Sequence, residues 1–245
     1  MRSVVLIRHN FALLAREPGP VLSRIAMPLV LITALQPLYT AALGTGGAAH
    51  AVTGMLILFS MLGLSIISGG ILTERAWHTL DRVRATPTTP VQILIGKAVA
   101  FGAVLLAQQA AILTYGVVVF DLPVIRPDLL LLVGLAWATT LLCMGAAVAT
   151  VVRSHSELGA VTDIGGLFLT VLGGAMVPLE LMPPWLHSLA PISPGYWALT
   201  GLRSAISGEV TATLRSVGVL ALVAAVTAMI AAWRITRGWA RNRLL

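Results

Sequence analysis

Charged side chains are scarce in this sequence. Asp, Glu, Lys and Arg make up 10% of its 245 residues, whereas a soluble domain typically carries about 25%. The longest polar stretch, residues 73–97, is too short to fold as an independent domain. This composition excludes a soluble enzyme and predicts one transmembrane domain over residues 1–245.

Residues for catalysis and cofactor binding are equally scarce. The single cysteine, Cys143, lies in an apolar run, which excludes an intramolecular disulfide and a multi-cysteine metal site. The five histidines are scattered, and the sequence has no paired-carboxylate, HExxH or G-x-S-x-G pattern. Gly96-Lys97 lacks the upstream glycine and the Ser or Thr of a phosphate-binding loop. We therefore expect a chain that is not an enzyme and that binds no metal or cofactor of its own.

What the sequence does contain is long apolar runs. Residues 25–73 hold no Asp, Glu, Lys or Arg, and three later runs are also free of charge. Because a charge in the middle of a bilayer is costly, charge-free runs of about 20 residues are typical of membrane-spanning helices. We predict an all-α polytopic membrane protein. Its six expected spans are residues 25–43, 51–72, 98–120, 129–152, 158–177 and 216–233.

The basic residues sort to alternate sides of these runs. All of the 16 Lys and Arg residues except Arg126, Arg203 and Arg215 fall on one side. Since basic residues concentrate on the cytoplasmic side, we expect a multi-pass protein of the bacterial cytoplasmic membrane with both termini in the cytoplasm. Contact with anionic lipid headgroups of the bilayer, and not with nucleic acid, then explains the net charge of +7.

Residues 1–20 are expected to form an amphipathic helix. Apolar residues recur at helical spacing, Phe11 among them, and Arg2, Arg8 and Arg16 supply the polar side. A helix of this kind lies along the membrane surface with its apolar face in the acyl boundary.

Four polar side chains fall inside the expected spans. Asp163 lies near the cytoplasmic end of the fifth span, while Gln36, Gln108 and Gln109 lie deeper. Polar residues at such positions line transport pathways in membrane proteins. Hydrogen bonding between helices explains the glutamines equally well, and a position at the headgroup level explains Asp163.

The charged segment at residues 73–97 carries the most specific pattern. An acidic–Arg pair is followed by Thr-Leu-acidic-Arg, then by Thr86-Pro87, and then by Gly96-Lys97. A solvated loop helix is the plainer interpretation. In this order, however, the pattern resembles the cytoplasmic coupling segment of type-2 ATP-binding-cassette (ABC) transporter permeases, with His78 in place of the usual glycine. The resemblance implies contact with a partner ATPase for Glu74, Arg75, Thr79, Leu80, Asp81, Arg82 and Arg84.

A second segment, residues 178–215, is apolar and rich in proline. It suits a helical hairpin that enters the outer leaflet and returns, or an ordinary loop with interfacial aromatic residues. The segment resembles the external re-entrant hairpin that precedes the last span in the same permease family. The matching residues are Pro178, Pro183, Trp185, Pro194, Tyr196, Trp197 and Arg203.

Together with six spans and an amphipathic start, the two patterns extend the resemblance over essentially the whole chain. It implies a permease subunit of the drug and antibiotic-resistance exporter type, although lipid-linked glycan exporters share the architecture. Two such permeases pair as a homodimer and bind two copies of a separate ATPase, which holds ATP and Mg. The nearly uncharged spans favour a hydrophobic or amphipathic cargo. A secondary transporter and a non-transporting membrane scaffold are the alternatives.

Overall fold

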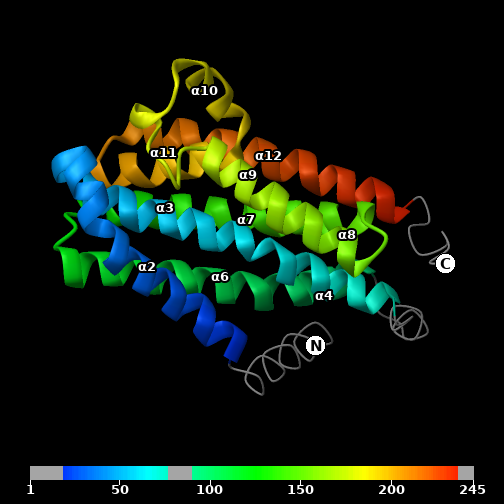
Figure 1. Ribbon diagram of the computed structural model, residues 1–245. Helices are drawn as coiled ribbons and strands as arrows, with labels where there is room; N and C mark the ends of the chain where they lie inside the picture. Colours follow the sequence, from blue (N-terminus) through cyan, green and yellow to red (C-terminus); the bar gives the residue numbers. More distant parts are fainter. Residues whose placement is uncertain (1–18, 77–89, 237–245) are drawn as a thin grey trace.

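The structure is a computed structural model that describes residues 19–76 and 90–236 (Figure 1). Within these residues every regular element is a helix, and short 3-10 and π segments join the α-helices. Residues 1–18, which hold nearly all of the expected interfacial helix, lie outside the described residues, and so does the middle of the charged segment, residues 77–89.

Six long helices form the body of the molecule, and all but the first run roughly along its long axis, which the first crosses obliquely (Figure 1). They are α2 (Gly19–Leu43), α3 (Gly47–Leu62), α4 (Leu64–Ala76), α6 (Pro90–Phe120), α7 (Pro127–Val151) and α12 (Val210–Thr236). The shorter segments are η1 (Gly44–Gly46), α8 (His155–Gly159), the π-helical η2 (Ala160–Ile164), α9 (Gly165–Leu172), η3 (Leu179–Leu181), α10 (Pro184–Leu189), η4 (Ala190–Ile192) and α11 (Pro194–Ser207).

Four stretches of the described residues are long and apolar enough to cross a membrane. The last three overlap the expected third, fourth and sixth spans, and the first contains both of the first two expected spans. These stretches are Leu22–Thr73, Ala98–Phe120, Pro127–Val151 and Val210–Ile235.

Several of the expected boundaries differ from the structure. The expected fifth span, residues 158–177, is a helix that ends at Leu172 and contains the π-helical η2. The last long helix begins at Val210 and not at Ser216, so the end of the expected hairpin segment is already part of α12. In the first stretch the chain turns back at η1, and α2 packs against α3.

α3 is the central helix of the bundle. Residues 50–61 are all buried, because α2, α6, α9 and α11 pack around it. Glycines allow the closest approaches. A Cβ atom at Gly54 would lie 2.1 Å from the carbonyl oxygen of Ala175, and one at Gly116 would lie 2.8 Å from a methyl carbon of Val52. A side chain at either glycine would push neighbouring elements apart.

The outside of the bundle is apolar. Val118 of α6, Phe168 of α9 and Leu222 of α12 are 72%, 64% and 63% exposed. In water a surface of this kind would drive association, whereas lipid chains solvate it. The apolar exterior and the buried α3 together indicate a helical bundle that stands in a bilayer.

Candidate functional site

The structure places the start of the predicted coupling segment on the last turn of α4, which carries Glu74 and Arg75. The chain returns as α6 at Pro90. α4 and α6 are thus the two helices that connect residues 77–89 to the bundle. The other predicted ATPase contacts, Thr79, Leu80, Asp81, Arg82 and Arg84, lie outside the described residues.

α3 and α4 meet at a break in the helical hydrogen bonding. The N–H of Gly63 donates to the carbonyls of both Phe59 and Ser60, each at 3.1 Å, and the N–H of Ile66 donates to the Gly63 carbonyl at 3.2 Å. In an uninterrupted α-helix, Ile66 would donate to Leu62. The carbonyl of Leu62 is therefore released from the backbone ladder.

Two side chains donate to this released carbonyl. The hydroxyl of Ser65 reaches the Leu62 oxygen at 2.9 Å, and Nη2 of Arg24 reaches it from α2 at 3.3 Å. A Cβ atom at Gly63 would lie 3.1 Å from Nη1 of Arg24, so the glycine leaves room for the guanidinium. Arg24 also interacts electrostatically with Asp163. One charged group thus connects α2 to the α3–α4 break, with the Asp163 carboxylate of η2 within electrostatic range.

Asp163 lies in η2, which packs against both α3 and α4. The hydroxyl of Thr162 donates to the Leu158 carbonyl at 2.8 Å and lies 3.3 Å from Oδ1 of Asp163. The Asp163 side chain is exposed in the single chain. π-helical turns within α-helices occur frequently at functional sites. A place for Asp163 in a transport pathway stays a prediction.

The three glutamines occupy different environments. Gln36 donates from Nε2 to the hydroxyl of Thr40 at 2.9 Å. Gln108 and Gln109 are only 1% and 3% exposed. Within the described residues, both polar side-chain atoms of Gln108, Nε2 of Gln109 and Nε1 of Trp137 have no hydrogen-bond partner. Each such atom costs about 1–3 kcal/mol, so a water molecule or a polar ligand group would bind favourably there. Their role in a pathway stays a prediction.

The other end of α2 contacts the hairpin region. The ring of Tyr39 lies against that of His50, with centroids 5.1 Å apart, and His50 is fully buried. Glu180 and Arg203 form an exposed ion pair at 3.9 Å between η3 and α11. Exposed pairs of this length contribute little to stability.

The predicted hairpin folds as α10 and α11 at one end of the bundle (Figure 1). Ser193 is the N-cap residue of α11. Its hydroxyl accepts from the Gly195 N–H at 3.1 Å and donates to the Leu169 carbonyl at 2.6 Å. The hairpin is thereby tied to α9. Of the predicted hairpin residues, Pro178 and Pro194 are buried, Tyr196, Trp197 and Arg203 are half-buried, and Pro183 and Trp185 are exposed.

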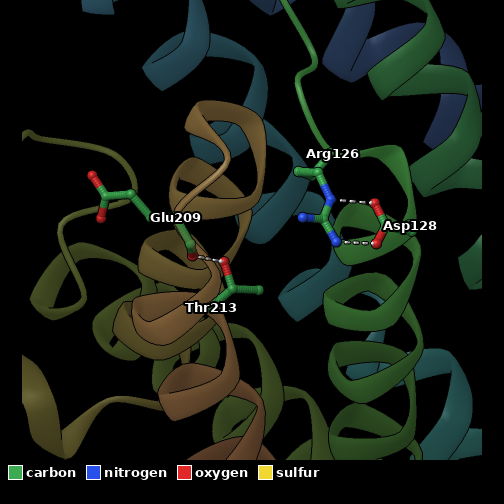
Figure 2. A network of polar contacts seen from close by, with 4 residues as sticks. All are labelled: Arg126, Asp128, Glu209 and Thr213. Atoms are coloured by element: carbon green, nitrogen blue, oxygen red, sulfur yellow. Dashed lines mark hydrogen bonds and ion pairs between the residues drawn. The ribbon is translucent and has the colours of Figure 1, made fainter.

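Two polar contacts near the hairpin lie at the N-terminal ends of α7 and α12 (Figure 2). Arg126 donates to both carboxylate oxygens of Asp128, at 3.0 and 2.8 Å. This pairing raises the pKa of Arg126 above its usual value. The hydroxyl of Thr213 donates to the backbone carbonyl of Glu209 at 2.7 Å. Both contacts shape the first turns of α7 and α12.

Residues 19–76 and 90–236 contain no group of three His, Cys, Asp or Glu residues able to hold a metal ion.

The contacts of Arg24 were not predicted from the sequence, in which this residue supported only the orientation of the chain. The available signals were a single arginine next to the first long apolar run and a glycine, Gly63, in the middle of the second expected span. Neither signal reveals that the two residues meet, because 38 residues separate Arg24 from Leu62.

Similarity to known proteins identifies the family of this chain. The family model for ABC-2 type transporters matches residues 2–207. The probable multidrug ABC transporter permease YbhR of Escherichia coli K12 is 25% identical over 58% of this chain and 39% of its own length. The linearmycin resistance permease protein LnrN of Bacillus subtilis is 24% identical over 73% of this chain and 47% of its own length. The inner membrane transport permease YhhJ of E. coli K12 is 28% identical over 53% of this chain and 35% of its own length.

The region matched is less than half the length of each of these relatives. The family model, in contrast, covers the chain from its N-terminal segment to the end of α11. That match agrees with the apolar, all-helical fold of the described residues and with the two sequence patterns. The chain therefore belongs to the ABC-2 type transporter family of membrane permeases.

Proposed function

We propose that this chain is the membrane-spanning subunit of an ATP-driven exporter. It moves a hydrophobic or amphipathic molecule, such as a drug, an antibiotic or a lipid-like compound, out of the cytoplasm or the inner leaflet. The family match over residues 2–207 carries the proposal. Two relatives whose names refer to multidrug transport and to linearmycin resistance support this class of cargo, as does the near absence of charge in the spans.

ATP hydrolysis belongs to a separate subunit in this proposal. The sequence has no phosphate-binding loop, so ATP and Mg are held by a partner ABC ATPase and the permease is non-catalytic. Two permease copies form a homodimer that binds two ATPase copies. The predicted contacts of Glu74 and Arg75, at the end of α4, give the ATPase a largely electrostatic docking surface.

Six membrane crossings complete the proposed topology. They are α2, α3 with α4, α6, α7, α8 with η2 and α9, and α12. The fifth crossing, from His155 to Leu172, is about 27 Å long at 1.5 Å per residue, close to the hydrocarbon thickness of about 30 Å. An even number of crossings keeps both basic ends of the chain in the cytoplasm of a bacterial cell.

The mechanism requires two packings of this bundle, one of which ATP binding favours. Closure of the ATPase dimer moves the coupling segment as a rigid lever. α4 and α6 carry the movement into the bundle, since they flank residues 77–89. The N-terminal segment provides a second contact along the membrane surface. The spans tilt, and a pathway at the dimer seam opens or closes.

Vesicles that contain the permease and its proposed partner ABC ATPase test the proposal. Vanadate-sensitive efflux of a lipophilic fluorescent probe is the expected result. Glu74→Arg and Asp81→Arg should each abolish efflux and ATPase stimulation while membrane insertion stays normal. Glu209→Arg is the matched control, because this acid is exposed at the start of α12 on the face expected outside.

Each rival interpretation has its own outcome in this assay. Efflux that stops on collapse of the proton or sodium gradient, but not with vanadate, would indicate a secondary transporter. Normal insertion without transport of any probe, and without ATPase stimulation, would indicate a scaffold. Full efflux by both charge-reversal variants would disprove the assigned ATPase contacts.

A further inference from the structure

The released carbonyl of Leu62 is an unusual feature for a membrane-embedded helix. Backbone groups in a bilayer must find partners within the protein, because lipid offers none. Here the partners are side chains of Ser65 and Arg24. The break is therefore stable only while these donors stay in place.

The two donors differ in what they connect. Ser65 belongs to α4 and Leu62 ends α3, so the Ser65 bond spans the break itself. Arg24 comes from α2, 38 residues earlier in the chain. By binding the Leu62 carbonyl, its guanidinium competes with the Ile66 N–H, which donates to Gly63 instead. Of the two donors, only the guanidinium comes from outside the α3–α4 pair.

Arg24 is linked through α2 and α4 to both segments that are predicted to face the ATPase. It lies in the second turn of α2, directly after the N-terminal segment. α4 leads from the break into residues 77–89 at its other end. Asp163 adds a third element through its electrostatic interaction with Arg24, and Gly166 of α9 lies close to Met61, just before the break. The contact thus lies where movements from both predicted ATPase-facing segments converge.

We infer that Arg24 is a latch, a positioning residue that holds the α3–α4 break in the arrangement seen here by binding the Leu62 carbonyl. Release of this contact frees the Leu62 carbonyl to accept from the Ile66 N–H as in a continuous helix, which turns α4 about Gly63. Hinges of this kind absorb a change in backbone angles at a few residues. The inference rests on the proposed exporter function and assigns Arg24 to the coupling of ATP hydrolysis to transport.

The first experiment measures coupling in vesicles that hold the permease and its ATPase. Arg24→Gln removes the charged donor, and a hydrogen bond to a charged group shifts an equilibrium by about tenfold or more. We expect vanadate-sensitive ATPase activity to persist while efflux per ATP falls about tenfold. Arg24→Lys keeps a cation and should retain part of the coupling. Arg126→Gln, which removes an exposed arginine elsewhere, should leave the ratio unchanged.

A glycine variant tests the same contact from the other side. A Cβ atom at Gly63 would lie 2.8 Å from the Ser60 carbonyl oxygen and 3.1 Å from Nη1 of Arg24, so Gly63→Ala should disturb both the break and the Arg24 contact and lower coupling as well. If both changes act on one contact, the double variant should be no worse than the poorer single variant. Additive losses would contradict the latch. Gly165→Ala is the control, since nothing lies within 4 Å of its Cβ position.

A distance measurement tests the hinge without requiring transport. Spin labels at Thr45→Cys in η1 and Thr73→Cys in α4, with Cys143→Ser, bracket the break. We expect a single narrow distance in the nucleotide-free complex and a shifted one after vanadate trapping. In Arg24→Gln the nucleotide-free distribution should already be broad.

The two outcomes of failure are separable. A wild-type complex without vanadate-sensitive efflux would overturn the proposed function, whatever Arg24 does. Efflux in the wild type, with an Arg24→Gln variant that keeps both the coupling ratio and the narrow distance, would overturn the latch alone.

Discussion

The hydroxyl of Tyr39 donates to the backbone carbonyl of Met176 at 2.6 Å, across 137 residues of sequence. Tyr39 is near the end of α2, and Met176 follows α9. The same ring lies against the buried His50 of α3. One tyrosine therefore ties the first long helix to the start of the hairpin region and to the central helix.

Tyr39→Phe should lower the free energy of unfolding by about 1 kcal/mol, because the ring packing stays and only one hydrogen bond is lost. Thermal unfolding in detergent measures the change. Tyr196→Phe is the control, since the Tyr196 hydroxyl has no hydrogen-bond partner in the described part of the chain. Equal losses in both variants would show that the Tyr39–Met176 bond adds nothing.

Gly54→Ala should be far more damaging than Gly165→Ala. The new Cβ atom at Gly54 would lie 2.1 Å from the Ala175 carbonyl oxygen, whereas the one at Gly165 meets open space. We expect a loss of about 3 kcal/mol or failed assembly for Gly54→Ala, and a neutral or slightly positive effect for Gly165→Ala. Yield of folded protein in detergent and its thermal midpoint give the comparison. A stable Gly54→Ala protein would contradict the close approach of α3 to residue 175.

Helix positions could be predicted from the sequence because charge is excluded from the bilayer core. The stretches Ala98–Phe120 and Pro127–Val151 lie close to the expected spans for this reason. Interruptions were harder to predict. The break at Gly63 and the π turn at η2 occur inside expected spans, and packing against neighbouring helices decides where they form.

Only segments with a local sequence pattern could be located in advance, and the roles of their residues stay predictions. The hairpin residues follow one another in sequence, and the structure folds them as α10 and α11. Contacts between distant residues leave no such pattern. Arg24 meets Leu62 and Trp137 becomes fully buried because of how the helices pack, and a single sequence cannot show that packing.

Gln108→Met should raise the thermal midpoint. Both polar atoms of the Gln108 side chain are buried without a partner among the described residues, and methionine has a similar shape without the desolvation cost. A gain of about 1–2 kcal/mol is expected. Gln36→Met serves as the control, since Gln36 already donates to Thr40 and should lose a little stability. Destabilisation by Gln108→Met would show that the carboxamide binds a buried water molecule.

Trp197→Phe should loosen the hairpin. The indole Nε1 donates to the Pro191 carbonyl at 2.9 Å, and the Arg215 guanidinium carbon lies 5.5 Å from the ring centroid. Phenylalanine keeps the ring but loses the donor, so a loss of about 1 kcal/mol is expected. Hydrogen exchange of α10 and α11 should rise. Trp185→Phe, at a residue that is 64% exposed, should change neither quantity.

α6 has 31 residues and is therefore about 46 Å long, well beyond the hydrocarbon thickness of about 30 Å. Its Phe120 end packs against the core of the bundle, so the turns in excess of the hydrocarbon thickness lie at the Pro90 end as a stiff strut. A continuous helix is stiff along its axis, so a displacement of Pro90 also displaces Tyr115 in the same helix. Tyr115 passes this displacement to α2, because its hydroxyl is hydrogen-bonded to Thr33 at 2.6 Å.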